Sequence, residues 1–290
     1  MRIEFLGTGG AIPTPRPGCH CELCERARQY GPPHARMGPS VFVHGPDILI
    51  DTPEEIRLQL NRAGIDHIAA CFYSHWHPDH TMGRRVWETM NSDWRGWPKR
   101  PQRTPIYLPK NVARDFEAGR LGLNEHFTFM AKQGTVELHI LEEGEEVVIN
   151  GVRVTPIAVA ESYVYAFLLE DGTERVLIAM DELVGWEPPD IVRGCDLAVI
   201  PTGVFEFDFF TGERRIPADH PVLKSEATFR ETLEIARQLA PSHLVFTHIE
   251  EPDGNSVEKL QRIASAIRDK EGWDVTFAFD TMVVEPPSGS

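Results

Sequence analysis

Long apolar runs are absent from this sequence of 290 residues, and no hydrophobic stretch approaches the length of a membrane span. Basic residues are also few, because 29 lysines and arginines stand against 44 aspartates and glutamates, giving a formal net charge of −15. A protein that binds nucleic acid in general is usually basic overall. The composition therefore argues against a membrane protein and against nucleic acid as a partner.

Cysteine is scarce as well, and its count of five is an odd number that does not suit a disulfide framework. Cys71 and Cys195 lie in apolar segments, where a buried free thiol is the usual outcome. The N-terminal stretch 1–6 has a strand-like pattern and lacks the hydrophobic region of a signal peptide. These features predict a cytoplasmic protein.

Internal repeats and low-complexity linkers are also absent, and this length suits one large α/β domain or two small ones. Hydrophobic periodicity predicts helices and strands along the whole chain. The predicted helices cover 54–63, 110–118, 225–239 and 256–270. The predicted strands cover 2–6, 40–43, 48–51, 69–73, 106–108, 136–140, 147–149, 152–158, 164–169, 176–179, 197–200, 244–247 and 275–279.

The order of these elements indicates the fold class. The first half is rich in strands, and the second half ends in strand–helix alternation. Two sheets packed face to face with helices outside them fit this order, which makes a four-layer α/β protein, an αββα sandwich. We expect a single domain over residues 1–285, with inserted loops near 84–104 and 205–220, and a flexible tail over 286–290.

The run 75–80, which reads HWHPDH, is the most informative stretch of the chain. The preceding residues 69–73 are apolar and predict a buried strand, while residues 81–90 predict a loop that enters a helix. The end of a strand before a helix is where an open α/β sheet exposes functional groups. A histidine-rich surface turn is the alternative, and this residue order after a buried strand argues against it. We interpret the run as a metal site.

The spacing within this run suits two cations. His75 and His77 project to the same side of an extended backbone and can share one ion, while Asp79 and His80 lie around the following turn and can serve a second ion. A site with two metals can hold a hydroxide and clamp the attacking and leaving oxygens of a displacement. The run therefore predicts a binuclear hydrolytic site.

Further ligands must come from the ends of other strands. His248 follows the apolar strand 244–247, and Asp181 follows the apolar stretch 176–180. A carboxylate at the end of a buried strand is costly unless it is paired or bound to metal. We therefore favour a bridging carboxylate for Asp181 and a metal ligand for His248, for which a capping or core histidine is the alternative.

Several short motifs match a known family in order along the chain. They are Leu6-Gly7-Thr8-Gly9-Gly10, the cluster 18–24, Ala27-Arg28, Leu49-Ile50-Asp51, the run 75–80, Asp181 and Thr247-His248-Ile249. Together they resemble the metallo-β-lactamase fold, and more narrowly the phosphodiesterases of the PhnP type, which open a phosphoribosyl cyclic phosphate. The histidine–aspartate run is specific for the fold, whereas the early cysteine cluster narrows the choice to the PhnP-like branch.

This resemblance implies how the ligands divide between two divalent ions, Zn²⁺ or Mn²⁺. One ion is expected on His75 and His77, the other on Asp79, His80 and His248, with Asp181 bridging. The family also implies a histidine ligand on the turn before the strand 164–169, and this sequence has Glu161 there. A carboxylate is still a competent ligand, and it shifts the preference toward harder ions such as Mn²⁺. We therefore predict Glu161 as a ligand; a weakened first site, or a ligand from elsewhere, is the alternative.

Three cysteines within six residues suggest an additional structural zinc. Cys19, Cys21 and Cys24 can place three thiolates around one Zn²⁺. In the resembled family the fourth ligand is a histidine three positions after the one corresponding to His248, and Glu251 occupies that position here. Other candidates for the fourth ligand are Glu250, Asp253, His20 and His34. Free thiols are the alternative interpretation, and a catalytic cysteine is disfavoured because no activating partner stands near in sequence.

Hydrolysis of a phosphodiester also needs an acid to protonate the departing alkoxide. His220 lies in a polar loop, and the PhnP-like pattern has a histidine acid at a comparable place; a surface histidine is the alternative. The predicted catalytic residues are Asp79 and His220. Aromatic and basic residues in 84–103 and 205–215 are candidates for pocket walls or for ordinary lid packing, so no substrate-binding residue is predicted.

These inferences favour a metal-dependent phosphodiesterase for a small cyclic or nucleotide-like phosphorylated substrate. Endonucleolytic processing of transfer RNA precursors is an alternative, which the acidic charge disfavours. Hydrolysis of a lactone or thioester uses the same metal pair, and outside enzymes a non-catalytic metal-binding protein is the alternative that Glu161 favours. The residues do not determine the oligomeric state, and a homodimer is one option.

Overall fold

The computed structural model describes residues 1–92, 95, 102–160 and 163–287. Two seven-stranded sheets form its centre. The first sheet has the order β14-β1-β2-β3-β4-β5-β6. Its strands are β1 (Arg2–Gly7), β2 (Ser40–His44), β3 (Ile48–Ile50), β4 (Ala70–Phe72), β5 (Thr104–Pro109), β6 (Val136–Leu141) and β14 (Val283–Val284).

The second sheet has the order β13-β12-β11-β10-β9-β8-β7. Its strands are β7 (Val147–Ile149), β8 (Val152–Ala158), β9 (Tyr165–Glu170), β10 (Arg175–Ile178), β11 (Leu197–Pro201), β12 (His243–Thr247) and β13 (Val275–Phe277). Neighbouring strands from β3 to β6 are parallel, and so are those from β10 to β13. The carboxyl ends of these parallel strands are therefore available to position a functional site.

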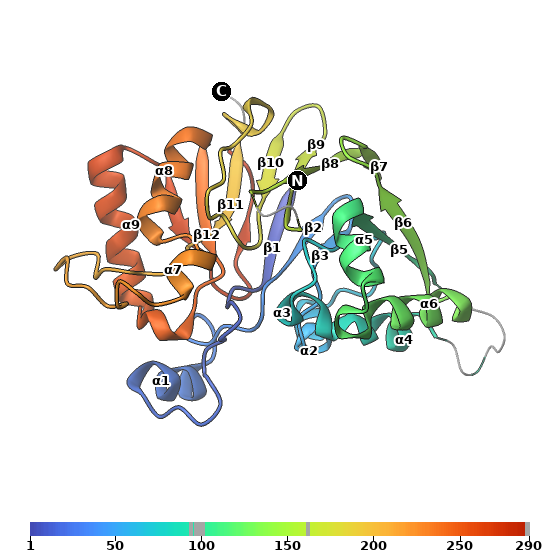
Figure 1. Cartoon of the computed structure of the whole chain (residues 1–290), viewed down its shortest axis with the longest axis horizontal. Helices are drawn as coiled ribbons and strands as arrows, with labels where there is room; N and C mark the ends of the chain where they lie inside the picture. The colour runs from blue at the N-terminus through green and yellow to red at the C-terminus, as the bar shows by residue number, and fades with distance from the viewer. Residues whose placement is uncertain (93–94, 96–101, 161–162, 288–290) are drawn as a thin grey trace.

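Helices cover the outer faces of both sheets (Figure 1). The helices on the side of the first sheet are α2 (Ile56–Ala63), α3 (Pro78–Thr81), η1 (Met82–Arg85), α4 (Val86–Asn91), α5 (Lys110–Glu117), η2 (Arg120–Gly122) and α6 (Leu123–Gln133). The remaining helices are α1 (Glu22–Tyr30), η3 (Asp190–Val192), α7 (Val222–Ser225), α8 (Phe229–Leu239), η4 (Glu251–Asp253) and α9 (Val257–Glu271). Helix α1 projects from the rest of the chain in Figure 1, whereas α8 and α9 lie beside the second sheet.

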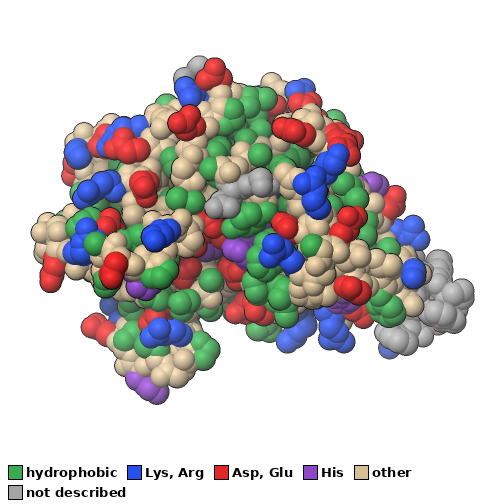
Figure 2. Space-filling model, in the orientation of Figure 1, with side chains coloured by type: hydrophobic (Ala, Val, Ile, Leu, Met, Phe, Trp, Pro, Cys, Tyr) green, Lys and Arg blue, Asp and Glu red, His purple; other side chains and the backbone are tan. Residues whose placement is uncertain are grey.

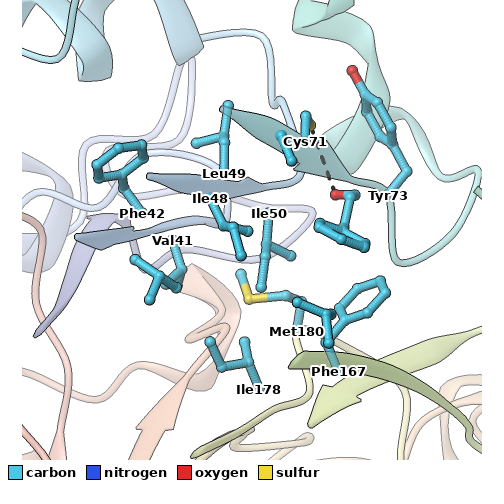
Figure 3. Close-up of a cluster of buried hydrophobic side chains, with 14 of the residues drawn as sticks. Val41, Phe42, Ile48, Leu49, Ile50, Cys71, Tyr73, Phe167, Ile178 and Met180 are labelled. Atoms are coloured by element: carbon cyan, nitrogen blue, oxygen red, sulfur yellow. Dashed lines mark hydrogen bonds between the residues drawn. The ribbon is translucent and has the colours of Figure 1, made fainter. Parts of the chain in front are cut away.

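The two sheets bury a common apolar core. Figure 3 shows Ile48 and Ile50 of β3 pointing toward Ile178 and Met180 of the second sheet, while Leu49 points the other way. This alternation follows from the two-residue period of a strand. Every residue of β3 and β4 is buried, as expected for strands covered on both faces. The predicted four-layer sandwich is confirmed.

The main differences from the sequence-based prediction concern helices. The single helix expected over 225–239 is two helices, α7 and α8, because Thr228 caps α8. The Thr228 hydroxyl accepts a hydrogen bond from the Glu231 amide at 3.3 Å, and the Thr228 amide donates to the Glu231 carboxylate at 2.8 Å. This capping box starts a new helix at Phe229.

The region expected as an inserted loop near 84–104 begins as helix, since η1 and α4 cover residues 82–91. Trp87 of α4 is fully buried and donates from Nε1 to the Tyr73 hydroxyl at 3.0 Å, so it belongs to the core and does not line a pocket. Trp94 and Trp97 of this stretch, and residues 288–290 of the expected tail, lie outside the described residues.

Candidate metal centre and adjoining pocket

The predicted ligands come from the carboxyl ends of strands in both sheets. His75 lies just beyond β4, and Asp79 and His80 lie in α3. Asp181 follows β10, and His248 follows β12. Figure 2 shows histidine and acidic side chains at the centre of this face, in a hollow of the surface. The structure thus brings together residues that are up to 173 positions apart in the sequence, from 75 to 248.

Asp181 lies in the middle of this group. Its Oδ2 is 3.4 Å from His75 Nε2 and 3.6 Å from His80 Nε2. Its other oxygen, Oδ1, is 3.4 Å from His248 Nε2. One carboxylate therefore faces histidines on two sides, which is the arrangement that a bridging ligand requires.

Asp79 completes the second half of the group. Its Oδ2 is 3.3 Å from His80 Nε2 and 3.6 Å from His248 Nε2. The ligand atoms thus form two overlapping sets, His75 with His80 and Asp181, and Asp79 with His80 and His248. His80 Nε2 lies near both sets, and because its single lone pair binds one ion, the expected division of the ligands between two ions stays a prediction.

The chemistry of this donor set fits divalent ions. His75 Nε2, His80 Nε2, His248 Nε2 and Asp79 Oδ2 are buried, and they have no hydrogen-bond partner among the described residues. Leaving a buried polar atom without a partner costs about 1–3 kcal/mol, more when the group is charged. Four such atoms in two adjacent groups are explained by bound cations, because imidazole nitrogens and carboxylate oxygens are ligands for Zn²⁺ and similar ions.

A second layer of residues orients the histidines. Asp51, at the end of β3, accepts a hydrogen bond from His80 Nδ1 at 2.7 Å through Oδ2. The same oxygen accepts from the Ser74 hydroxyl at 2.6 Å, and Oδ1 accepts from the Ser74 amide at 2.8 Å. The proton on His80 Nδ1 leaves Nε2 as the ligand nitrogen, and such partners are typical of metal-binding histidines.

Electrostatics in this group depend on its burial. Burial acts to raise the pKa of Asp181, but His248 and His75 outweigh burial and hold that pKa well below its usual range. Burial acts to lower the pKa of His248, but Asp181, Asp79 and Glu250 together outweigh burial and raise that pKa to about 10. For His77 burial prevails, together with the nearby His75, and lowers the pKa to about 4. His77 is therefore neutral at physiological pH, as a ligand must be.

His77 stands at the edge of the group. Its ring centroid is 4.4 Å from that of His75 and 5.8 Å from that of Tyr163, on the side that precedes β9. It is not a member of either ligand set. Glu161, the predicted ligand on that side, lies outside the described residues, so its role stays a prediction.

Strained backbone occurs at three positions of the site. Asp51, Glu182 and His248 have φ values of 62°, 54° and 52°, in the left-handed region that non-glycine residues seldom adopt. Such conformations persist where the surrounding structure imposes them, often at functional sites. Gly10 has a related role, since a Cβ there would lie 2.2 Å from Glu250 Oε1 and 2.6 Å from His248 Cε1.

The cysteine cluster forms a second group, on the lobe that carries α1. The Sγ atoms of Cys19, Cys21 and Cys24 lie 3.4, 3.3 and 3.2 Å from one atom, Oε1 of Glu251. Burial raises the pKa of the Cys24 thiol to about 12. Burial also acts to raise the pKa of Glu251, but hydrogen bonds from the three thiols outweigh it and lower that pKa. Three sulfurs and one oxygen suit tetrahedral Zn²⁺.

The other candidates for the fourth position point elsewhere. Nδ1 of His20 lies 2.7 Å from Glu25, and the His20 side chain is 82% exposed. Asp253 Oδ1 accepts from the Phe205 amide at 3.0 Å. Glu250 accepts hydrogen bonds at 2.9 Å from two backbone amides, those of Ala11 and Ile12. Among the described residues, Glu251 is therefore the carboxylate that meets the cysteines.

A pocket of about 550 Å³ opens beside the metal ligands and includes Asp181 and His248 in its wall. His220 also lines it, so the predicted acid and two predicted ligands share one cavity. The His220 ring accepts a hydrogen bond at Nδ1 from the Val222 amide at 3.2 Å, which leaves the proton of the neutral ring on Nε2. The loop after β11 thus contributes to the pocket wall, one of the two interpretations that the sequence left open.

Sequence reasoning missed several residues of this site as functional candidates. Asp51 follows a buried strand in the same way as Asp181, and this signal could have identified it. Glu226 lines the pocket but lies in a polar stretch that gives no sequence signal, and Glu250, considered above only as a zinc ligand, lines the pocket as well. Burial raises the pKa of Glu226 to about 7, and the negative charge of Asp181 adds to the effect.

Comparison with known proteins identifies the family. The model of the β-lactamase superfamily domain matches residues 47–249. The chain belongs to this superfamily. This match spans the run 75–80, Asp181 and His248, so the β-lactamase superfamily domain contains the entire histidine–aspartate group.

Solved structures show the same fold along nearly all of this β-lactamase superfamily chain. A new diphosphatase from the PhnP family is 24% identical, with a TM-score of 0.72, covering 98% of this chain and 97% of that one. Zn²⁺-bound PqqB from Methylobacterium extorquens is 17% identical, with a TM-score of 0.68, and the match covers 98% of this chain and 100% of PqqB. The expected metallo-β-lactamase fold and the resemblance to PhnP-type proteins are confirmed.

Two further similarities are partial. The long form of RNase Z from yeast has a TM-score of 0.56 at 14% identity, and the match covers 98% of this chain but 41% of that one. The octanoyltransferase of Porphyromonas gingivalis is 36% identical over 86 residues, which make up 29% of this chain and 17% of that protein. The chain therefore spans less than a fifth of this curated relative. None of the described helices has the length and hydropathy required to cross a bilayer.

Proposed function

We propose that this protein is a binuclear metal-dependent phosphodiesterase acting on a small cyclic or nucleotide-like phosphodiester. The observation that carries the proposal is the placement of Asp181, whose two oxygens face His75 and His80 on one side and His248 on the other. In this proposal His75 and His77 hold one ion with Glu161 beside them, Asp79, His80 and His248 hold the other, and Asp181 bridges the two.

The metals and the protein supply different parts of the chemistry. Two divalent ions would lower the pKa of a coordinated water and offset charge on the phosphoryl oxygens. The protein holds His80 in place through Asp51 and excludes bulk water, since His75 and His80 are fully buried. His220, with its proton on Nε2, lines the same pocket and is the group we assign to protonate the departing alkoxide.

Other observations bear on metal identity, location and rival functions. The three thiols around Glu251 support an additional structural Zn²⁺. The five cysteines form no disulfide, which supports a cytoplasmic location. The net charge of −15 supports a small substrate over transfer RNA, although the fold is shared with RNase Z. A lactone or thioester hydrolase is the second candidate, because the pocket wall beside the ligands is largely apolar.

One experiment separates these functions. Metal content is measured on purified protein, and hydrolysis is measured for bis(4-nitrophenyl) phosphate, an aryl lactone and a structured RNA. We expect about two ions besides the structural zinc and turnover of the phosphodiester, lost in Asp181→Asn and retained in His67→Ala, a control on an exposed histidine. Metal-loaded protein that cleaves the lactone and leaves the phosphodiester intact would overturn the proposal.

A further inference from the structure

The pocket beside the metal ligands has a second part that the proposed chemistry does not use. This part extends from His248 toward the loop after β11 and the turn η4. Its wall is mostly apolar, with the side chains of Leu183, Val204, Phe205, Ile216, Val222 and Ala227. The whole pocket has a volume of about 550 Å³, within the range of about 300–1,000 Å³ that holds a small organic molecule. We call this part the outer pocket.

Two carboxylates in the outer pocket have oxygens that can accept further hydrogen bonds. Asp253 is 7% exposed, and its Oδ2 is buried without a hydrogen-bond partner among the residues that the structure describes. Glu226, on the opposite side, is half-buried, and its carboxylate makes no hydrogen bond or ion pair within the described part of the chain. A buried acceptor without a partner is costly, so a ligand that donates to it is favoured.

Arg215 lines the outer pocket, and its guanidinium group already donates hydrogen bonds to other protein groups. Arg215 donates from Nη2 to Asp208 Oδ2 at 2.7 Å, and from Nη1 to the Asp253 carbonyl and to Asn255 Oδ1. Its charge is therefore offset by Asp208, and its donors are directed at the protein. Beyond the metal ligands, the remaining ionisable side chains of the wall are Glu182, Glu226, Glu250, Asp253 and His220. A second anionic group on a substrate would meet mostly like charge.

We infer that the outer pocket selects a phosphodiester whose second group is apolar and carries an amine or ammonium N–H donor, and that it rejects one with a further carboxylate or phosphate. Asp253 and Glu226 accept from the donor, and Phe205, Ile216 and Val222 pack against the apolar part. This inference rests on the proposed phosphodiesterase function and adds the class of substrate to it.

The test uses three diesters with the same reacting half. Butyl, 4-aminobutyl and 3-carboxypropyl 4-nitrophenyl phosphate release the same 4-nitrophenolate, so differences in kcat/KM report the second group. We expect kcat/KM for the aminobutyl ester to be about tenfold or more higher than kcat/KM for the carboxypropyl ester, since a hydrogen bond to a charged group has an effect of that size. Asp253→Asn and Glu226→Gln should each narrow this ratio, and Asp190→Asn, on the exposed η3, should leave it unchanged.

Binding without turnover separates failure of the inference from failure of the proposed function. Titration with 4-phenylbutylamine and 4-phenylbutyrate needs no hydrolysis, and we expect the amine to bind more tightly, with weaker binding in Asp253→Asn. If no ester is cleaved but the amine still binds more tightly than the carboxylate, the phosphodiesterase proposal is wrong and the inferred preference of the outer pocket for an amine is supported. Equal binding of the two compounds, tighter binding of the carboxylate, or a preference that persists in both variants overturns the inference.

Discussion

At the scale of single residues, the metal centre depends on side chains that never touch a metal. Asp51 accepts one hydrogen bond from His80 Nδ1 and two from Ser74. It is fully buried and has a left-handed backbone. This residue fixes the orientation of the His80 ring and directs its Nε2 toward Asp79 and Asp181.

We expect Asp51→Asn to weaken metal binding by about 10- to 100-fold, because the amide cannot hold the His80 tautomer as the carboxylate does. Competition with a fluorescent chelator measures the affinity. Asp47→Asn is the matched control, since Asp47 also has a positive φ, near the other end of β3, and takes no part in the site. Equal metal affinity in Asp51→Asn and the natural protein would show that Asp51 has no orienting role.

Cys21 offers a residue-scale test of the structural zinc. We expect Cys21→Ser to remove about one equivalent of zinc and to leave the ions at Asp181 in place, since three thiolates are needed with Glu251. The lobe around α1 should then become sensitive to proteolysis. Cys195→Ser, a buried cysteine far from the cluster in sequence, serves as the control for zinc content. Unchanged zinc in Cys21→Ser contradicts the assignment.

At the scale of elements, the loop after β11 links the pocket to the helical layer. Asp208 in this loop accepts from Lys259 Nζ of α9 at 2.6 Å and from Arg215 at 2.7 Å. Phe207 lies beneath two guanidinium groups, with Arg214 at 4.4 Å and Arg230 of α8 at 5.0 Å. The aromatic residues of the loop therefore pack mainly on α8 and α9, and Phe205 reaches the pocket.

The interactions of Asp208 with Lys259 and Arg215 make a pH-dependent contribution to stability. Hydrogen bonds from Lys259 and from the Thr211 and Phe210 amides lower the pKa of Asp208 below its ordinary 3.8. The contribution of Asp208 to stability is therefore fully present above the pKa that Asp208 has in the unfolded chain. It is lost as the pH falls through the lower pKa that Asp208 has in the folded protein. We expect Asp208→Asn to cost about 1 kcal/mol in urea unfolding at pH 7 and less below about pH 4. A cost that does not change with pH contradicts this account.

At the scale of the whole molecule, the site exists because two sheets meet. His75 and His80 depend on the first sheet, Asp181 and His248 on the second, and the apolar layer in Figure 3 sets the distance between them. A hydrogen bond from the Tyr165 amide of β9 to the Ser74 carbonyl, at 3.0 Å, joins the sheets beside the site. Packing in the core and geometry at the metal centre are therefore coupled.

We expect Ile178→Ala, which opens a cavity between the sheets, to lower the free energy of unfolding by about 2–5 kcal/mol, and Ile178→Val to lower it by about 1 kcal/mol. Ile178 is fully buried and lies three residues before Asp181. Urea unfolding measures the stability, and metal affinity should weaken in the alanine variant more than in the valine variant. Stability that does not differ between the two variants would mean that the core relaxes around the change.

The sequence by itself determined most of the strands and the residue types of the site. Buried strands that end in His75, Asp181 and His248 are readable because hydrophobic periodicity is local and a polar residue at its end is costly without a partner. The same local signals predicted the αββα sandwich, which is confirmed. The ligand assignments stay predictions, and the structure supports them by bringing the side chains together.

Only the tertiary structure decided which residues share a site. Five carboxylates or histidines were candidates for the fourth zinc ligand from the sequence, and folding placed one of them, Glu251, with its Oε1 against all three thiols. The shared position of His80, the support from Asp51 and the outer pocket around Asp253 likewise depend on contacts between distant segments. Such contacts are set by how sheets and loops pack, and packing is not written in any local pattern of the chain.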